Sequence, residues 1–129
     1  IISTMAQSVK LETVVEELNN RIYDCLCHED ERQRSSGHLY FIRPKGIGEL
    51  ERNEIIGKLA ERGIATNVHY KPLPLLTAYR NLGFKMNDYP NSYSFYKNEI
   101  TLPLYSKLTE EQVEYIIDNT VKVLQDYVD

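Results

Sequence analysis

Residues 63–70 read Gly-Ile-Ala-Thr-Asn-Val-His-Tyr, and Lys-Pro-Leu-Pro follows at 71–74. Gly63 comes directly after a stretch with helical spacing, a position where glycine commonly ends a helix in the left-handed conformation. The β-branched residues that follow favour an extended strand. Pro72 ends this strand, because the residue before a proline is pushed to extended geometry. We therefore expect a strand over 64–70 that carries His69 and Tyr70 to the edge of a sheet.

The strand pattern gives His69 and Tyr70 different surroundings. Successive side chains of a regular strand face opposite sides, so only one of the two can point to the covered face of the sheet. From the residues alone we favour Tyr70 in the core and His69 at the surface. A functional interpretation stays open beside this one. A histidine at a strand end could move a proton or bind a sugar hydroxyl or phosphate, and a tyrosine could contact the same ligand.

The spacing of apolar residues predicts the helices. Residues that recur at intervals of three or four indicate amphipathic helices over 9–26 and 50–62. One or two helical turns are expected over 75–82, and a short helix is expected over 91–98.

The C-terminal helix has the clearest start of all. Thr109 and Gln112 match a capping box, and Leu108 with Val113 matches a hydrophobic staple. The predicted buried stripe of this helix is Val113, Ile116, Ile117, Thr120, Val121, Leu124 and Val128.

Aromatic and β-branched runs predict the other strands. Residues 38–43 and 100–102 have this composition, and Pro44 and Pro103 follow them. With 64–70 they make three short strands separated by helices. We therefore expect the α+β class, with a small three-stranded sheet covered by helices that lie mostly on one face.

Length and composition restrict the class of protein. A chain of 129 residues with 42% hydrophobic and 26% charged residues is typical of one globular domain. The net charge of −4 argues against nucleic-acid binding, which needs a clustered basic surface. No apolar run approaches the roughly 20 residues of a membrane span, and the N-terminus lacks the pattern of a signal peptide. We expect a cytoplasmic location. Because position 1 is not Met, we also expect that the segment comes from a longer protein.

Cys25 and Cys27 are the only cysteines, and His28 adjoins them. Zinc sites usually pair cysteines two to four residues apart and add a second pair of ligands. These cysteines are separated by one residue and have no matching second pair. We therefore expect no metal site and interpret them as reduced, partly buried thiols.

Ten tyrosines are many for this length. Tyr89, Tyr93 and Tyr96 could form a surface that contacts a carbohydrate or another subunit. We favour packing at the edge of a domain for these three side chains.

Four motifs, in the same order along the chain, resemble the C-terminal end of the DegT-type (DegT/DnrJ/EryC/StrS) sugar aminotransferases. The resemblance covers residues 38–127. The motifs are His38-Leu39-Tyr40-Phe41-Ile42-Arg43; Glu61-Arg62-Gly63-Ile64 with Val68-His69-Tyr70; Tyr79-Arg80, Gly83-Phe84 and Tyr89-Pro90; and Leu102-Pro103-Leu104-Tyr105 with Leu108-Thr109 and Gln112-Val113. The family commonly has a second histidine after the His-Tyr pair, where this sequence reads Lys71-Pro72-Leu73-Pro74.

The resemblance implies a fold-type I enzyme that depends on pyridoxal phosphate (PLP). Such an enzyme moves an amino group, usually from glutamate, to a keto sugar carried on a nucleotide, and it is a homodimer. The lysine and the carboxylate that hold PLP belong to a large domain that precedes this region. The resemblance therefore implies no catalytic or cofactor-binding residue in this chain. It implies that His69 and Tyr70 orient the sugar nucleotide, with Tyr79 nearby.

On this basis we expect residues 1–37 to be a connecting helix and loop and residues 38–129 to be the small C-terminal domain. The chain alone is expected to be inactive, with the missing large domain as its partner. The alternative is a free-standing α+β binding or assembly module whose tyrosine-rich surface contacts a partner protein.

Overall fold

The computed structural model describes residues 23–25 and 30–127. Its elements, in chain order, are β1 (Tyr23–Cys25), β2 (Tyr40–Pro44), α2 (Glu49–Glu61), the 3-10 helix η1 (Leu73–Leu75), α3 (Thr77–Asn81), the 3-10 helix η2 (Met86–Asp88), α4 (Pro90–Tyr96), β3 (Ile100–Leu102) and α5 (Glu110–Leu124). Among the described residues no helix is long and apolar enough to cross a membrane.

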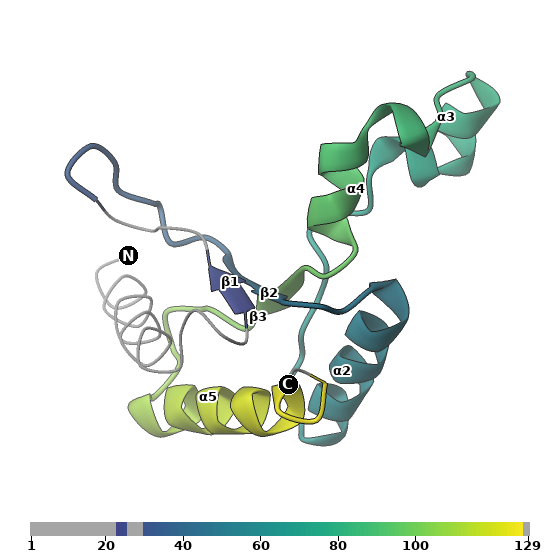
Figure 1. Cartoon of the computed structure of the whole chain (residues 1–129). Helices are drawn as coiled ribbons and strands as arrows, with labels where there is room; N and C mark the ends of the chain where they lie inside the picture. The colour runs from purple at the N-terminus through teal and green to yellow at the C-terminus, as the bar shows by residue number, and fades with distance from the viewer. Residues whose placement is uncertain (1–22, 26–29, 128–129) are drawn as a thin grey trace.

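The three strands form one antiparallel sheet in the order β1-β2-β3. In the register of this sheet Tyr23 lies opposite Pro44, and Tyr40 lies opposite Leu102. Helices α2 and α5 lie together on one side of the sheet (Figure 1). The predicted α+β class with a small three-stranded sheet is confirmed, and so are the strands predicted over 38–43 and 100–102.

The structure contradicts two predicted elements near this sheet, the first of them over three residues only. The helix predicted over 9–26 does not include Tyr23–Cys25, which form the edge strand β1; residues 9–22 and 26 lie outside the described residues. The run 64–70 is not a regular strand, because only Asn67 pairs with β3, in an isolated bridge to Thr101. Beyond this bridge, side-chain oxygens accept the hydrogen bonds that a neighbouring strand would otherwise accept. The amide of Val68 donates to Asn67 Oδ1 at 2.8 Å, and the amide of His69 donates to Glu99 Oε2 at 2.9 Å. Such side-chain acceptors compete with strand pairing.

The core lies between the sheet and the two long helices. Alternate residues of β2 are buried, as the period of a strand requires. The buried apolar cluster is Tyr40, Ile42, Ile47, Ile55, Leu59, Ile64, Ile100, Leu102, Leu108, Val113, Ile116, Ile117, Val123 and Leu124. In the stripe predicted for α5, Val121 is only partly buried and Val128 is not described, while the prediction did not include the buried Val123.

Local signals place the ends of both long helices. At the start of α5, Thr109 Oγ1 accepts from the amide of Gln112 at 3.2 Å, and Gln112 Oε1 accepts from the amide of Thr109 at 2.9 Å. This is the predicted capping box. After α2, Gly63 has a φ of +73°, and the amide of Ile64 donates back to Leu59 O at 3.0 Å. That left-handed ending, a Schellman motif, carries the chain from α2 into the run that contains His69.

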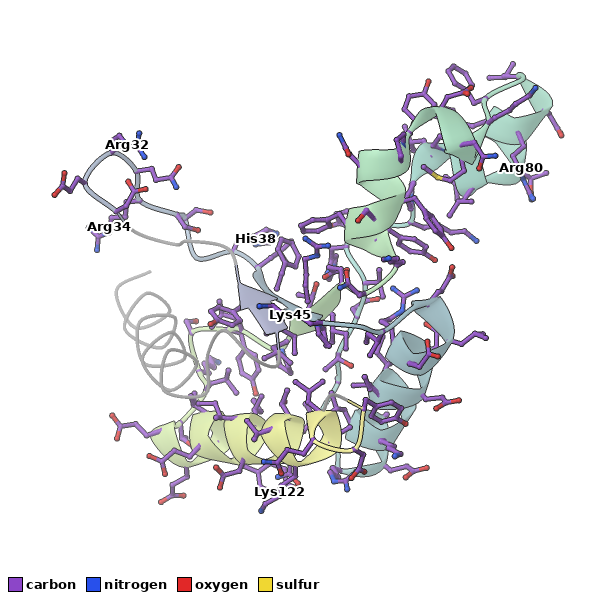
Figure 2. All side chains as sticks on the ribbon, viewed as in Figure 1. Arg32, Arg34, His38, Lys45, Arg80 and Lys122 are labelled. Carbon is purple, nitrogen blue, oxygen red and sulfur yellow. The ribbon has the colours of Figure 1, made fainter. Side chains whose placement is uncertain are left out.

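The elements η1, α3, η2 and α4 form an arm, residues 73–96, that projects away from the sheet (Figure 1). Its short helices agree with the helical turns predicted over 75–82 and 91–98. Arg43 of β2 fixes the base of the arm, because its guanidinium donates to Ser94 O at 3.0 Å and lies 4.7 Å from the centre of the Phe95 ring. Figure 2 shows Arg80 at the opposite end, far from the sheet.

Candidate functional site

His69 lies in the loop beside β3 and is half-buried. Its Nδ1 is 2.8 Å from the hydroxyl of Thr101, a residue of β3. The Tyr70 ring meets the His69 ring edge-on, with 4.6 Å between the ring centres, and the peptide bond between the two residues is cis. The structure therefore brings His69 and Tyr70 together at one edge of the sheet.

The structure reverses the burial that we favoured for these two residues from the sequence alone. Tyr70 is 73% exposed, whereas His69 is the more buried of the two. The prediction of a core tyrosine and a surface histidine was wrong because it assumed a regular strand. In the observed loop Thr101 and Glu99 offer polar partners to His69, and these partners hold it against β3.

Behind His69 lies the carboxylate of Glu99, which is fully buried with 0% exposure. Its Oε2 accepts from the amide of His69 at 2.9 Å, and its Oε1 accepts from the hydroxyl of Thr101. Burial raises the pKa of Glu99 above its ordinary value of 4.5, and the hydrogen bonds from Thr101 and His69 oppose this rise. His69, Thr101 and Glu99 form one connected network, which we call the His69 network.

The raised pKa of Glu99 predicts how the stability of the chain changes with pH. The folded chain holds this proton more tightly than the unfolded chain does. Its contribution to stability is therefore complete below about pH 4.5, the ordinary value, and is lost as the pH rises through the raised pKa. We expect Glu99→Gln, which cannot ionise, to remove this loss. The measurement is urea unfolding of both proteins across a series of pH values, in which the stability of the wild type should fall relative to the variant above pH 4.5.

The matched control for this prediction is Glu61→Gln. Glu61 is an exposed carboxyl at the end of α2, and its substitution should leave the pH dependence close to that of the wild type. Parallel stability curves for the wild type and the Glu99 variant would contradict the prediction.

Arg52 contacts the backbone of Glu99, a member of the His69 network. Arg52 as a whole is 1% exposed, and its guanidinium donates to Tyr96 O at 3.1 Å and approaches Glu99 O at 3.5 Å. The same group lies 4.8 Å from the centre of the Tyr96 ring, and it forms an ion pair with Glu49 at 3.6 Å. Arg52 thus fixes the segment that joins α4 to β3, where Glu99 begins the approach to the strand.

Tyr79 lies on α3 in the arm, whereas His69 and Tyr70 lie beside β3. Its ring contacts Phe84, with 6.0 Å between the ring centres. Both rings line an apolar pocket of about 340 Å³, together with Leu73, Pro74, Tyr89 and Ser92. Within the part of the chain that the structure describes, no ring contact joins Tyr79 to the His69–Tyr70 pair.

The other tyrosines divide between packing and exposure. Tyr96 is 7% exposed and donates its hydroxyl to Glu49 Oε1 at 2.8 Å, so it packs at the base of the arm. Tyr89 and Tyr93 stay 41% and 38% exposed. Packing at the domain edge therefore holds for Tyr96. Tyr93 contacts the Tyr96 ring, with 6.2 Å between the ring centres, but stays exposed, as Tyr89 does.

Sequence reasoning missed Glu99 and Thr101. One signal was present, because a carboxylate directly before the apolar strand Ile100–Leu102 is an unusual choice for a buried position. Which residue would pair with that carboxylate could not be read from the sequence, since His69 lies 30 positions away.

The described residues do not form a PLP site, which requires a lysine for the imine and a carboxylate near the pyridine nitrogen. No lysine of the described residues is buried. Lys97 lines a pocket with Tyr93 and Ser94, but no carboxylate lines that pocket. Lys58 is paired with Asp126 at the surface, at 3.4 Å. The same part of the chain holds no cluster of histidine, cysteine or acidic residues that could bind a metal; Cys27 and the side chain of Cys25 lie outside the description.

Comparison with known proteins places this geometry in a family. The chain superimposes on Spr1654 of Streptococcus pneumoniae, assigned as a sugar aminotransferase, with a TM-score of 0.90 and 47% identity. The match covers 96% of this chain and 30% of Spr1654 in its apo form. Spr1654 has also been solved in a PMP form and in a PLP form.

Curated relatives match the same region. The spore coat polysaccharide biosynthesis protein SpsC of Bacillus subtilis is 34% identical over 95 residues, which are 70% of this chain and 24% of SpsC. The UDP-4-amino-4,6-dideoxy-N-acetyl-beta-L-altrosamine transaminase of Helicobacter pylori is 31% identical over 96 residues, which are 74% of this chain and 25% of that enzyme. The chain therefore spans about a quarter of the length of these relatives.

A model of the DegT/DnrJ/EryC1/StrS aminotransferase family matches residues 6–121, which is most of the chain. The chain therefore belongs to the DegT/DnrJ/EryC1/StrS aminotransferase family.

Proposed function

We propose that this chain is the C-terminal part of a PLP-dependent aminotransferase that acts on a keto sugar carried on a nucleotide, in amino-sugar biosynthesis. The observation that carries the proposal is the His69–Tyr70 pair, which the buried Glu99 and Thr101 hold at the edge of the sheet. Membership of the aminotransferase family supports it, as do the PLP form of Spr1654 and the name of the Helicobacter pylori transaminase.

In this proposal the chain contributes substrate contacts. His69 and Tyr70 bind the sugar nucleotide, His69 through its outer ring nitrogen and Tyr70 through its exposed phenol and ring face. Tyr79 contributes a third contact from its apolar pocket in the arm. PLP, when bound to the complete enzyme, supplies the electron sink for amino transfer. The lysine and carboxylate that hold PLP come from the preceding large domain, so the chain alone is inactive.

The complete protein in this proposal has a large domain, a connection and a small domain. Residues 38–129 form the small domain and residues 1–37 the connection to the large domain, with β1 of the connection added to the edge of the sheet. The complete enzyme is a homodimer in the cytoplasm and takes its amino group from glutamate.

The experiment uses the complete gene product, loaded with PLP, and measures amino transfer from glutamate to a panel of keto-sugar nucleotides. We expect His69→Ala to lower kcat/KM for the sugar nucleotide by about tenfold to a hundredfold, equal to the roughly 1.4–2.7 kcal/mol of one hydrogen bond to the substrate. The half-reaction with glutamate should change much less. Activity with none of the keto sugars would refute the proposed function.

His38 supplies the matched control for this experiment. It is the exposed histidine just before β2, and Figure 2 shows it beside the sheet. We expect His38→Ala to leave kcat/KM within a factor of about two, because surface substitutions away from a site usually have small effects. Equal losses in the two variants would contradict a substrate contact by His69.

One observation favours the second candidate, a free-standing binding module: Tyr89 and Tyr93 on the arm remain exposed. The intact mass of the native gene product separates the two candidates. A product much larger than 15.0 kDa supports the aminotransferase, and a product of 15.0 kDa supports the module.

A further inference from the structure

The His69 network allows only one direction of hydrogen bonding when Glu99 is ionised. An ionised carboxylate can only accept hydrogen bonds, and a hydroxyl has a single proton to donate. Oε2 of Glu99 accepts from the amide of His69, and Oε1 accepts the proton of the Thr101 hydroxyl. The Thr101 oxygen then has no proton left for the imidazole. It must accept from Nδ1 of His69, which lies 2.8 Å away.

We infer that ionised Glu99 and Thr101 fix the imidazole of His69 in the tautomer that carries its proton on Nδ1, so that Nε2 is presented as a hydrogen-bond acceptor for a hydroxyl or amino group of the substrate. The substrate part of this inference rests on the proposed function, whereas the tautomer does not. Glu99 and Thr101 are positioning residues, because they act on the substrate only through His69.

The geometry at Nε2 agrees with this assignment. Among the described residues Nε2 has no hydrogen-bond partner, since the one ring bond of His69 is the contact of Nδ1 with Thr101. An unprotonated nitrogen matches a donor, such as a sugar hydroxyl or an amine. It does not match a phosphate oxygen, which can only accept. His69 therefore selects the sugar rather than the diphosphate of the nucleotide.

Glu99→Gln should reverse the network without changing its shape. The amide of His69 still needs an acceptor at the position of Oε2, so the side-chain carbonyl of the glutamine occupies that position and its NH₂ group faces Thr101. The Thr101 oxygen then accepts from this NH₂ group and donates its own proton to Nδ1 of His69. The imidazole proton moves to Nε2, which becomes a donor.

The test records long-range proton–nitrogen correlation spectra of the ¹⁵N-labelled chain over a series of pH values from neutral to alkaline. It reads the tautomer on the alkaline plateau, where Glu99, whose pKa burial raises, has lost its proton. The protonated and unprotonated ring nitrogens of a neutral imidazole resonate far apart, so the spectrum reads the tautomer directly. His69→Gln identifies the signals of His69 among the three histidines. We expect Nδ1–H in the wild type and Nε2–H in Glu99→Gln. A proton on Nε2 in the wild type, or an unchanged tautomer in Glu99→Gln, would overturn the inference.

A pair of Thr101 variants tests the same network if Glu99→Gln does not fold. Thr101→Ser keeps the hydroxyl and should keep the Nδ1–H tautomer. Thr101→Val keeps the shape, removes the hydroxyl and should yield a mixture of tautomers. A single Nδ1–H tautomer in Thr101→Val would overturn the role of the hydroxyl.

The role toward the substrate has its own readout in the complete enzyme. We expect Glu99→Gln to raise the KM for the keto-sugar nucleotide by about tenfold and to leave the KM for glutamate nearly unchanged, because a donor replaces an acceptor at one contact. Thr101→Ser should behave as the wild type does. If the tautomer reverses and the KM does not change, Nε2 does not bind the sugar, and that part of the inference is refuted. If the complete wild-type enzyme shows no transamination with any keto sugar, the proposed function is refuted, whereas the assignment of the tautomer is unaffected.

Discussion

Leu59→Ala is expected to lower the free energy of unfolding by about 2–5 kcal/mol, the usual cost of truncating a fully buried leucine. Leu59 is 0% exposed and belongs to the apolar cluster between α2, α5 and the sheet. The substitution removes buried apolar surface, and it also leaves a cavity that the two packed helices can fill only in part. The measurement is the shift of the urea unfolding midpoint at constant slope.

Leu50 gives this prediction a matched control on the same helix. It lies in the first turn of α2 and is 76% exposed. Leu50→Ala removes the same atoms from a solvated position, so we expect a change within about 0.5 kcal/mol. Similar losses for the two variants would mean that α2 does not pack as the structure describes.

The sequence was sufficient for elements that short-range chemistry specifies. The capping box of Thr109 and Gln112 predicted the start of α5, because both partners of those hydrogen bonds lie within one helical turn. Gly63 predicted the end of α2 for a similar reason, since a left-handed residue after a helix favours glycine. The class of the fold followed from these helices and from the apolar runs of β2 and β3.

Where the partner lies far along the chain, the sequence was not sufficient. The composition of 64–70 favours a strand, but the amide of His69 is taken by a carboxylate 30 residues away. The prediction therefore placed Tyr70 in the core, although it is exposed. Strand β1 was missed because the spacing of apolar residues over 9–26 continues through Tyr23–Cys25, and only pairing with β2 makes that segment extended.

Only part of the candidate site was predicted from the sequence. The His-Tyr pair was found from its position before two prolines and from the family resemblance. Its supporting residues were not, since Thr101 is an ordinary strand residue until the bridge to Asn67 brings it beside the imidazole. The contribution of Tyr79 stays a prediction, because the arm carries Tyr79 to a pocket of its own.

Arg52→Ala is expected to lower the free energy of unfolding by about 3 kcal/mol. The guanidinium is buried and satisfies the carbonyl oxygen of Tyr96 at 3.1 Å, and its loss leaves that acceptor without its charged donor in a dry environment. The stem of Arg52 also packs in the interior, so the variant leaves a void. Glu49, the ion-pair partner, is partly exposed, and water can solvate it when Arg52 is absent. For this reason we expect the cost to come mainly from the Tyr96 carbonyl and the void rather than from an unpaired charge.

Two further variants separate the contribution of the guanidinium from those of its positive charge and of a surface arginine. Arg52→Lys keeps the positive charge but loses the planar fork that reaches Tyr96 O while lying against the Tyr96 ring. It should therefore lose roughly half of the stability lost by the alanine variant. Arg62→Ala removes an exposed arginine that caps a carbonyl of the same helix, and it should cost less than about 1 kcal/mol. Urea unfolding measures all three variants, and a cost for Arg52→Ala no larger than that for Arg62→Ala would contradict the prediction.

The position of Arg52 also predicts which part of the chain loses local stability when Arg52 is substituted. Its contacts lie at the C-terminal end of α4 and at the carbonyl of Glu99, the point at which the arm returns to the sheet. Glu99 and Thr101 come directly after this junction in the sequence, and they hold His69. Loss of the Arg52 contacts should therefore increase local opening at the candidate site more than in α5. In Arg52→Lys we therefore expect faster amide hydrogen exchange over 96–101 and at His69, with little change in α5. Uniformly faster exchange would mean that Arg52 contributes to overall stability alone and does not hold the His69 network in place.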